Sequence, residues 1–341
     1  TCIACNQACL DHTFKLKRST CLVNPRACYE TELVSKPAEA PKKMAVVGAG
    51  PAGLAFATSA AERGHDVTLF ESAAQIGGQF NLAKRVPGKE EFEETLRYFR
   101  KRLEITGVQV RLNQRAKADD LKGFDHVVLA TGVLPRKPRI PGMDHAKTVF
   151  YADVLTGKKV IGNRVAIMGA GGIGFDVAEF LLHGHGASPS LDIPAFLKEW
   201  GVDRRAEARG AVEGVKAEPA APPRQVYLVQ RKTTPHGKGL GKTTGWIHRA
   251  QLKMKNVSFV GGADYTRIDD RGLHYKDAQG AEKCLEVDHV VICAGQEPLR
   301  ELEAPLKAAG VQVHLIGGAD VAAELDAKRA IRQGTELALS L

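Results

Sequence analysis

The sequence has no long hydrophobic run and no export signal. In 341 residues, no stretch approaches 18 uncharged apolar residues, and the amino terminus lacks the basic-then-apolar pattern of a signal peptide. Nothing therefore indicates membrane insertion or secretion, and we expect a cytoplasmic protein without a membrane partner.

Aromatic residues are also scarce, at 6% of the chain, and they are not interleaved with basic residues as in nucleic-acid binders. The net charge is +9, but the 48 Lys and Arg residues are scattered among 39 Asp and Glu residues. Because no nucleic-acid-reading motif is present, we expect no nucleic-acid partner. The positive excess fits anionic small ligands better.

Cysteines are few and unevenly placed, with four of the seven in the first 21 residues. This number argues against a disulfide framework and leaves metal or redox chemistry. The spacing C-x2-C-x3-C-x11-C favours a [4Fe-4S] cluster, because structural zinc usually takes two separated thiolate pairs; zinc and thioredoxin-like thiols remain alternatives. The predicted ligands are Cys2, Cys5, Cys9 and Cys21, while Cys28, Cys284 and Cys293 lack partner spacing and are expected to be structural.

The segment "KKMAVVGAGPAGLAFATSAAERGHDVTLFE" predicts a dinucleotide-binding strand, glycine turn, helix and second strand. In this pattern Gly48 makes the tight turn, Gly50 lets the backbone approach a pyrophosphate, and Gly53 lets helix and strand pack closely. Glu71 lies 18 residues past Gly53, near the usual spacing of about 20 for the acid that binds a ribose 2′-hydroxyl. The predicted contacts, which suit FAD, are Gly48, Gly50, Pro51, Ala52, Gly53 and Glu71.

A second loop of the same kind occurs in "NRVAIMGAGGIGFDVAEFLL". Its next strand, in "RQVYLVQRK", ends on Arg231 and Lys232 where the first ended on an acid. Paired cations attract a 2′-phosphate, so this site is predicted to favour NADPH; the alternative is that two exposed cations simply solvate a strand end. The predicted contacts are Gly169, Gly171, Gly172, Ile173, Gly174, Arg231 and Lys232.

Later motifs complete a recognisable order: "IGGQF", "VVLATGVLPRKP", "VVICAGQEP" and "VHLIGGAD". This order resembles the flavoprotein reductases of the glutathione reductase type. The resemblance implies an α/β fold with two Rossmann-like three-layer domains, preceded by an iron-sulfur segment. It implies residues 1–40 as that segment, 41–150 with 290–341 as a discontinuous FAD domain, and 151–289 as an inserted NADPH domain.

The same resemblance implies further flavin contacts at Gly78, Gln79, Thr131, Gly132, Gly295, Gly318 and Asp320. Asp320 would contact the ribityl chain, or alternatively act as an ordinary helix N-cap. The run after it, "VAAELDAKRAIRQGTELAL", predicts an amphipathic helix whose amino terminus favours negative charge on the reduced flavin.

Longer runs, including "CIACNQACLDHTF", "GGQFNLAKRVPGKEEF" and "GLGKTTGWIHR", resemble the carboxy-terminal part of bacterial NADPH-dependent 2,4-dienoyl-CoA reductases. The resemblance implies that NADPH reduces FAD, which passes single electrons through the cluster to FMN. The FMN would lie in an amino-terminal TIM barrel, outside this chain, that reduces dienoyl-CoA in fatty acid β-oxidation. The chain starts at Thr1 with a motif already under way, so we expect a piece of a longer protein.

Three alternatives remain. One is the scaffold region of a trimethylamine or histamine dehydrogenase type, binding ADP, although there the third cysteine is expected one residue closer. The second is a stand-alone NADPH:acceptor reductase module, and the third is a binding module that holds a nucleotide and zinc without catalysis.

Two regions are expected to carry no chemistry of their own. Residues 183–223 predict one short helix in "LDIPAFLKEWGVD", followed by a mobile surface loop rich in Ala and Pro. His248 is expected to have a positional role, with Lys242, Trp246 and Arg249 near the nucleotide, because hydride transfer between cofactors needs no side-chain acid. No catalytic residue is therefore assigned.

Overall fold

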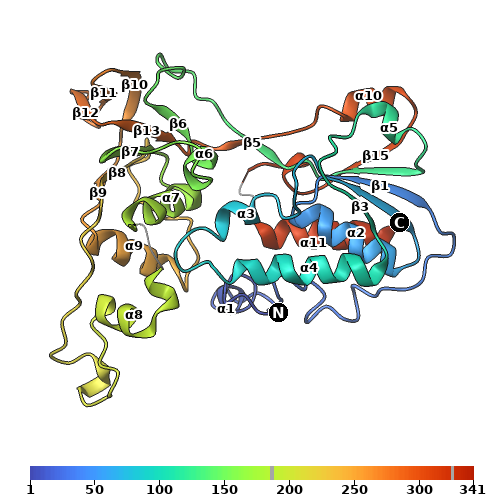
Figure 1. The fold of residues 1–341 in the computed structure, drawn as a ribbon, viewed down its shortest axis with the longest axis horizontal. Coiled ribbons are helices and arrows are strands. Elements are labelled where there is room, and N and C mark those ends of the chain that lie inside the picture. Colours follow the sequence, from blue (N-terminus) through green and yellow to red (C-terminus); the bar gives the residue numbers. More distant parts are fainter. Residues whose placement is uncertain (185–187, 324–325) are drawn as a thin grey trace. The chain divides into compact units, whose positions relative to one another are not determined.

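A computed structural model describes residues 1–184, 188–323 and 326–341 of the chain (Figure 1). These divide into unit 1, comprising Thr1–Asn81, Glu91–Arg136 and Gly295–Leu341, and unit 2, comprising Leu82–Glu90 and Lys137–Ala294. The boundaries expected at 150 and 290 therefore move to 136 and 295. The reason is that strands β6 (Thr148–Phe150) and β13 (His289–Ile292) pair with each other in the sheet of unit 2.

Unit 1 contains a five-stranded parallel sheet with the strand order β15-β4-β1-β2-β3. Alternate residues of β1 face opposite sides: Met44 and Val46 enter one core, while Ala45 and Val47 enter another. Each face of the sheet is therefore covered. The strands are β1 (Lys43–Val47), β2 (Asp66–Phe70), β3 (Gln109–Arg111), β4 (His126–Leu129) and β15 (Gln312–Leu315).

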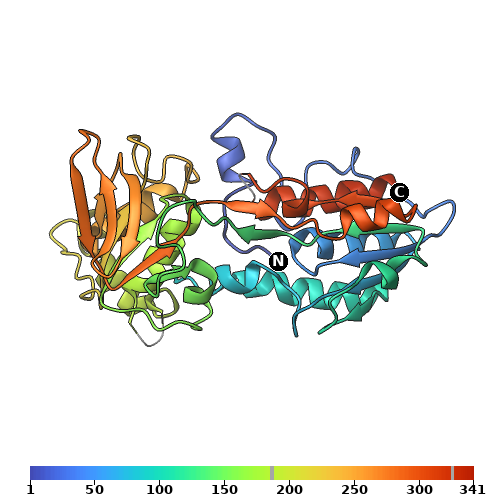
Figure 2. The ribbon, with the colours of Figure 1, turned by 90° about the horizontal axis from the view of Figure 1, so that it is seen from above.

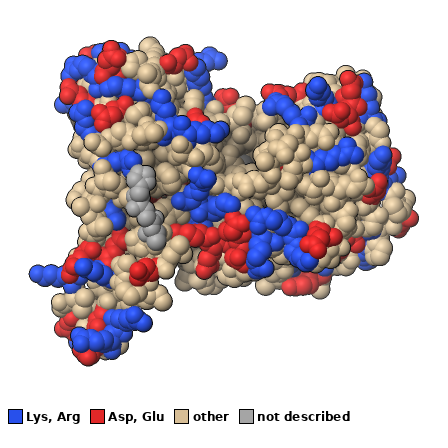
Figure 3. All heavy atoms as spheres, in the orientation of Figure 1, with Lys and Arg blue, Asp and Glu red and all other residues tan. Residues whose placement is uncertain are grey.

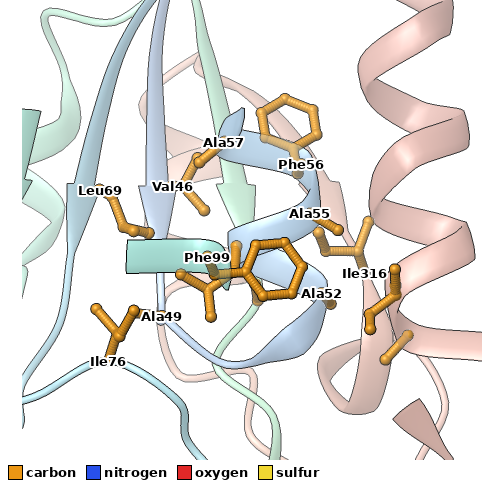
Figure 4. Close-up of a cluster of buried hydrophobic side chains, with 14 of the residues drawn as sticks. Val46, Ala49, Ala52, Ala55, Phe56, Ala57, Leu69, Ile76, Phe99 and Ile316 are labelled. Atoms are coloured by element: carbon orange, nitrogen blue, oxygen red, sulfur yellow. The ribbon is translucent and has the colours of Figure 1, made fainter. Parts of the chain in front are cut away.

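Three long helices cover the first of these faces. Helix α2 (Pro51–Glu62) packs against both α4 (Phe92–Thr106) and α11 (Ala327–Ser340) (Figures 1 and 2). Alanines along α2 pack with Phe56, Phe99 and Ile316 (Figure 4). The opposite face is covered by Leu121 of α5 (Ala118–Leu121) and Leu306 of α10 (Glu303–Ala308).

The amino-terminal segment packs as part of unit 1. The structure describes all of residues 1–42, and the one helix among them is the short α1 (Leu10–Thr13). Ile3, Ala8 and Leu22 are buried in the same core as α2 and β1. Cys5 and Cys21, which lie near these residues in the chain, pack against the same core. The cysteine segment is thereby held against β1 and α2, the elements that the first glycine loop joins.

Unit 2 has three layers. Its parallel sheet has the order β6-β13-β7-β8-β9, and beside it lies an antiparallel sheet of β10, β11 and β12. In β7, Val165 and Ile167 face a core lined by helices, whereas Ala166 and Met168 face a core shared with residues of the second sheet. The three-layer α/β architecture is confirmed. Its remaining elements are β7 (Arg164–Met168), β8 (Gln225–Val229), β9 (Ser258–Val260), β10 (Asp264–Asp269), β11 (Gly272–Lys276), β12 (Glu282–Glu286), α6 (Tyr151–Leu155), α7 (Gly172–Leu182) and α9 (Gly245–Met254).

The region between α7 and β8 contains the predicted helix, α8 (Ile193–Trp200), which Asp192 caps by accepting a hydrogen bond from the backbone N–H of Ala195 at 3.0 Å. Glu199 of α8 forms a buried ion pair with Lys255, at 3.0 Å, next to the end of α9. Two short 3-10 turns, Pro189–Leu191 and Arg209–Ala211, complete the described part of the region. Residues 185–187, at its start, and 324–325, inside the run predicted as a helix after Asp320, lie outside the described residues.

Two short strands, β5 (Val133–Pro135) and β14 (Gln296–Pro298), pair antiparallel within unit 1 where the chain passes between the units. Short α3 (Phe80–Ala83) follows the glycine-containing segment 76–79. Across the described residues, no helix combines the length and apolar character that a membrane span requires. Positive and negative side chains are interspersed over the face of the molecule shown in Figure 3.

Candidate functional site

The first glycine loop joins β1 to α2, and two of its glycines are required by packing. Gly48 has φ +105°, and a Cβ there would lie 2.4 Å from the carbonyl oxygen of Ala130. A Cβ on Gly53 would lie 2.0 Å from the carbonyl oxygen of Gly48. Gly50 differs, because no heavy atom lies within 4 Å of its Cβ position. The loop is therefore closed on the sheet side and open at Gly50.

The open side is the amino terminus of α2. Gly50 is the N-cap, Pro51 follows at the first helical position, and no side chain of the described residues caps the helix. The backbone N–H groups of the first turn, beginning with Ala52, therefore remain available to an anion, and the helix dipole favours negative charge there. This geometry suits a pyrophosphate.

Glu71 directly follows β2 and holds the loop in shape. Its Oε2 accepts a hydrogen bond from the backbone N–H of Ala49 at 2.8 Å, and its Oε1 accepts one from the N–H of Ala73 at 2.8 Å. Oε1 also accepts a hydrogen bond from the Ser72 hydroxyl at 3.2 Å. A carboxylate oxygen can accept two hydrogen bonds, so Glu71 can orient the loop and still bind a ribose hydroxyl through Oε2, which stays a prediction.

The segment 76–80 packs against the same loop. The N–H of Gly77 donates to the carbonyl oxygen of Ala49 at 2.8 Å. Gly78 has φ +50°, and a Cβ on it would lie 3.0 Å from the Cα of Gly50. Gly78 and the exposed Gln79 are therefore next to the open side of the loop, as the predicted flavin contacts require.

The predicted residues at the ends of β4 and β14 also converge within unit 1. The hydroxyl of Thr131 donates to the carbonyl oxygen of Leu299 at 2.5 Å, and the N–H of Leu299 donates to Gly132 at 3.1 Å. Gly132 and Gly295 have φ values of +75° and +104°, which favour glycine. The carbonyl of Gly295 accepts a hydrogen bond from the N–H of Arg136 at 3.0 Å.

Asp320 is held by a residue that the sequence motifs did not indicate. The side-chain amide of Gln333, on α11, donates to Asp320 Oδ2 at 2.7 Å, and its oxygen accepts from the N–H of Gly317 at 2.8 Å. Gln333 therefore clamps the turn that contains the buried Gly318. Asp326, whose Oδ1 accepts from the N–H of Arg329 at 2.7 Å, is the N-cap of α11. The alternative interpretation of Asp320 as the cap of this helix is wrong.

The second glycine loop repeats the geometry of the first. Gly169 has φ +117°, and a Cβ on it would lie 2.3 Å from the carbonyl oxygen of Cys293. A Cβ on Gly174 would lie 1.9 Å from the carbonyl oxygen of Gly169, whereas Gly171 and Gly172 are open. Gly171 is the N-cap of α7, which has no side-chain cap among the described residues, so this helix also offers free N–H groups beside Ile173.

Arg231 and Lys232 lie just beyond β8, which ends at Val229, and both are exposed. Neither has an ion pair among the described residues. The backbone around them is fixed, because the carbonyl oxygen of Lys232 accepts hydrogen bonds from the side chain of Gln230 and the N–H of Gly262, both at 3.1 Å. Two positive charges thus stand on a fixed backbone, with no acidic partner in the part of the chain that the structure describes.

The segment after these cations returns to the second glycine loop. The N–H of Gly237 donates to the carbonyl oxygen of Ala170 at 3.3 Å, and Arg249 donates to Gly237 at 3.2 Å. His248 Nδ1 lies 2.6 Å from Oε1 of the buried Glu179 on α7. His248 and Arg249 therefore hold α9 against the loop and α7.

The four amino-terminal cysteines are all free thiols in this structure. Burial raises the pKa of Cys5, and the nearby thiols of Cys9, Cys21 and Cys2 raise it further. The other three thiols therefore each interact electrostatically with that of Cys5. The N–H of Ala4 donates to Cys2 Sγ at 3.4 Å, and the N–H of Gln7 lowers the pKa of Cys5, as hydrogen bonds to a thiolate do.

Within the described residues, no three His, Cys, Asp or Glu side chains form a group that could hold one metal ion. Such a site for zinc needs sulfur atoms about 3.8 Å apart, given Zn–S bonds of about 2.3 Å. A [4Fe-4S] cluster binds each thiolate to a different iron, so its ligands do not converge on one point. The donor set and its N–H···S bonds fit a cluster, which stays a prediction.

The other cysteines do not join this group. Cys284 Sγ lies 3.6 Å from His274 Nε2 on the neighbouring strand, and burial raises the pKa of Cys284. Burial also raises the pKa of Cys293, which follows β13. Neutral thiols of this kind fit the structural roles that were expected.

Comparison with known proteins gives relatives over nearly the whole chain. A metal reductase of Desulforamulus reducens is 32% identical over 93% of the chain and 47% of its own length. An NADH oxidase of Thermoanaerobacter brockii is 32% identical over 93% of the chain and 44% of its own length. The solved structure of a 2-naphthoyl-CoA reductase complex superposes with a TM-score of 0.83 at 27% identity, over 100% of this chain and 46% of that one.

The chain thus spans about half the length of the curated relatives that it matches. The profile of the family described as "Pyridine nucleotide-disulphide oxidoreductase" matches residues 42–329, which include both glycine loops and Asp320. This family implies FAD and NAD(P)H as cofactors, in agreement with the two open helix termini. The chain belongs to the pyridine nucleotide-disulphide oxidoreductase family.

Proposed function

We propose that the chain is the NADPH-oxidising electron-transfer part of a 2,4-dienoyl-CoA reductase type of enzyme. The observation that carries this proposal is the pair of glycine loops, which share one geometry but are followed by opposite charges. Glu71 after β2 suits a ribose with free hydroxyls, whereas Arg231 and Lys232 after β8 suit a ribose that carries a phosphate. Two loops with opposite preferences indicate two different nucleotides.

The residues of unit 1 would hold FAD. The α2 amino terminus at Gly50 would bind the pyrophosphate, Glu71 the adenosine ribose, and Asp320 the ribityl chain. In unit 2 the α7 amino terminus would bind the NADPH pyrophosphate. When bound, the two cofactors supply hydride transfer from nicotinamide to flavin, a step for which the protein provides position and electrostatics.

The cysteine segment would hold a [4Fe-4S] cluster through Cys2, Cys5, Cys9 and Cys21, which supplies a one-electron carrier. This segment shares a buried core with β1 and α2, so its thiols have a fixed position relative to the first glycine loop. The remaining partner in the proposal is an FMN-containing TIM-barrel domain of the same polypeptide. The chain matches only 44–47% of the length of the metal reductase and the NADH oxidase, so the rest of each relative is long enough to contain a further domain.

The acyl-CoA substrate class is supported by the similarity to the 2-naphthoyl-CoA reductase structure. The relatives named metal reductase and NADH oxidase favour a second candidate, an NAD(P)H:acceptor reductase that does not act on acyl-CoA. Both candidates share NAD(P)H oxidation by this chain and differ only in the final acceptor.

Anaerobically purified protein tests the proposal. We expect bound FAD, about four irons with matching acid-labile sulfide per chain, and reduction of ferricyanide by NADPH, with no activity on dienoyl-CoA by this chain alone. Zinc without sulfide would contradict the cluster. Protein that retains ADP, and whose flavin absorbance does not bleach with NADPH, would instead support the amine dehydrogenase type of scaffold.

A further inference from the structure

Helix α11 contacts the cysteine segment through two cationic side chains on one of its faces. Lys328 Nζ lies 3.3 Å from His12 Nε2, on α1. The guanidinium of Arg332 lies 4.2 Å from the centre of the Tyr29 ring, and that of Arg18 lies 4.4 Å from the same ring. Lys328 and Arg332 are four residues apart, so they share one helix face.

The partners of His12 define which atoms carry protons. His12 Nδ1 lies 2.9 Å from the carbonyl oxygen of Arg18, which can only accept, so Nδ1 carries the hydrogen. An ammonium can only donate, so Nε2 accepts from Lys328. The pair therefore consists of a neutral imidazole and a cation, and the imidazole orients the cation toward the cysteine segment.

The cation contacts the short helix that directly follows a predicted thiolate ligand. Cys9 is the N-cap of α1, with a non-helical backbone, and His12, the residue that Lys328 contacts, lies three residues later in the chain. Among the described residues, Lys328 Nζ pairs with the carboxylate of Asp326, at 3.8 Å. Asp326 also caps α11 through its other oxygen, and the Lys328 side chain is only 29% exposed. Its charge is therefore screened by water only in part.

We propose that Lys328, oriented by His12, raises the reduction potential of the centre held by Cys2, Cys5, Cys9 and Cys21. This inference rests on the proposed iron-sulfur cluster. Reduction adds one negative charge at the thiolates and their metal, and a nearby cation stabilises that charge. Lys328 is in this role a positioning and electrostatic residue, and it is not a ligand.

The test is a redox titration of the anaerobic chain, followed by electron paramagnetic resonance, on matched variants. Lys328→Met removes the charge, Lys328→Gln removes it but keeps a donor for His12, and Lys328→Arg keeps both. Lys307→Met is the control, because Lys307 lies on α10, which covers the opposite face of the sheet. We expect both neutral variants to lower the equilibrium constant for reduction about tenfold, or about 59 mV for one electron. The Arg variant and the control should match the parent.

The outcomes separate the two proposals. A parent protein without iron and sulfide would overturn the proposed function and this inference together. A parent with iron, but with the same potential in Lys328→Gln, would overturn only the role of Lys328, as would an equal drop in Lys307→Met. If Lys328→Met does not retain its iron, Lys328→Gln decides, since it can keep the hydrogen bond to His12.

Discussion

Replacement of Arg231 and Lys232 by alanine should remove the preference for NADPH. Both side chains are exposed and lack ion pairs among the described residues, so their loss leaves no unpaired buried group. The carbonyl oxygen of Lys232 keeps its hydrogen bonds from Gln230 and Gly262, because these involve only the Lys232 backbone. The fold of the site should therefore persist in the double variant.

The size of the effect follows from the contacts that a 2′-phosphate would make. Hydrogen bonds to charged groups contribute about 1.5–3 kcal/mol each. Both cations are exposed, so the lower value applies, and two contacts give about 3 kcal/mol. Since about 1.4 kcal/mol corresponds to a factor of ten, kcat/KM for NADPH should fall about 100-fold. The value for NADH, which has no 2′-phosphate, should change less than about threefold.

Steady-state reduction of ferricyanide with each nucleotide measures this difference. The matched control is Lys158→Ala with Lys159→Ala, which removes two exposed positive charges from the same unit. These lysines precede β7, at the opposite end of the sheet from Arg231 and Lys232. Equal losses for NADPH and NADH, or an equal NADPH loss in the control, would show that the two cations do not recognise the phosphate.

Three further comparisons of variants test the geometry. Gly50→Ala should abolish flavin binding but leave the melting temperature of the flavin-free protein unchanged, because its added methyl group meets no protein atom within 4 Å. Gly53→Ala, whose Cβ would lie 2.0 Å from a carbonyl oxygen, should destabilise the flavin-free protein by more than about 4 kcal/mol. Equal melting temperatures of the two flavin-free variants would refute this contrast. Gln333→Leu should weaken reconstitution with FAD by about 1–3 kcal/mol, since its partners lose their hydrogen bonds; unchanged affinity would contradict the clamp. Lys255→Met should lower the free energy of unfolding, measured in urea, by about 3–5 kcal/mol, because it leaves the Glu199 carboxylate buried and unpaired. The double variant Lys255→Met with Glu199→Leu should regain most of the lost stability. A double variant as unstable as the single one would show that packing matters more than the ion pair.

The glycine loops were predictable from sequence because each strand, turn and helix lies within about 30 residues, the length of a βαβ unit. The steric need for Gly48 and Gly53 follows from that local geometry and is seen directly. The clamp by Gln333 could not be predicted in the same way. A glutamine on a helix carries no motif, and its contacts depend on how α11 packs beside α2.

The domain boundaries show a related limit. Strand β13 was expected in the FAD domain, because the resemblance to the glutathione reductase type implied a boundary at residue 290, before the motif "VVICAGQEP". In the structure, β13 pairs with β7 of unit 2. After a gap of three residues, β14 pairs with β5 of unit 1. A hydrophobic run predicts a strand, but only pairing shows which sheet contains it. The buried pair of Glu199 and Lys255 is likewise a contact between distant segments that charge patterns alone do not predict.

The residues after β2 and β8 are alike in position but differ in what they do in the free protein. Both oxygens of Glu71 already accept backbone hydrogen bonds, from Ala49 and Ala73, so this acid shapes the loop before any ligand binds. Arg231 and Lys232 make no comparable side-chain contacts among the described residues. Substitution of Glu71 would therefore disturb the FAD loop and its ribose contact together, and its effect could not be assigned to either. The two cations are the cleaner test of nucleotide selectivity, because neither forms an ion pair with a described residue whose loss would complicate the result.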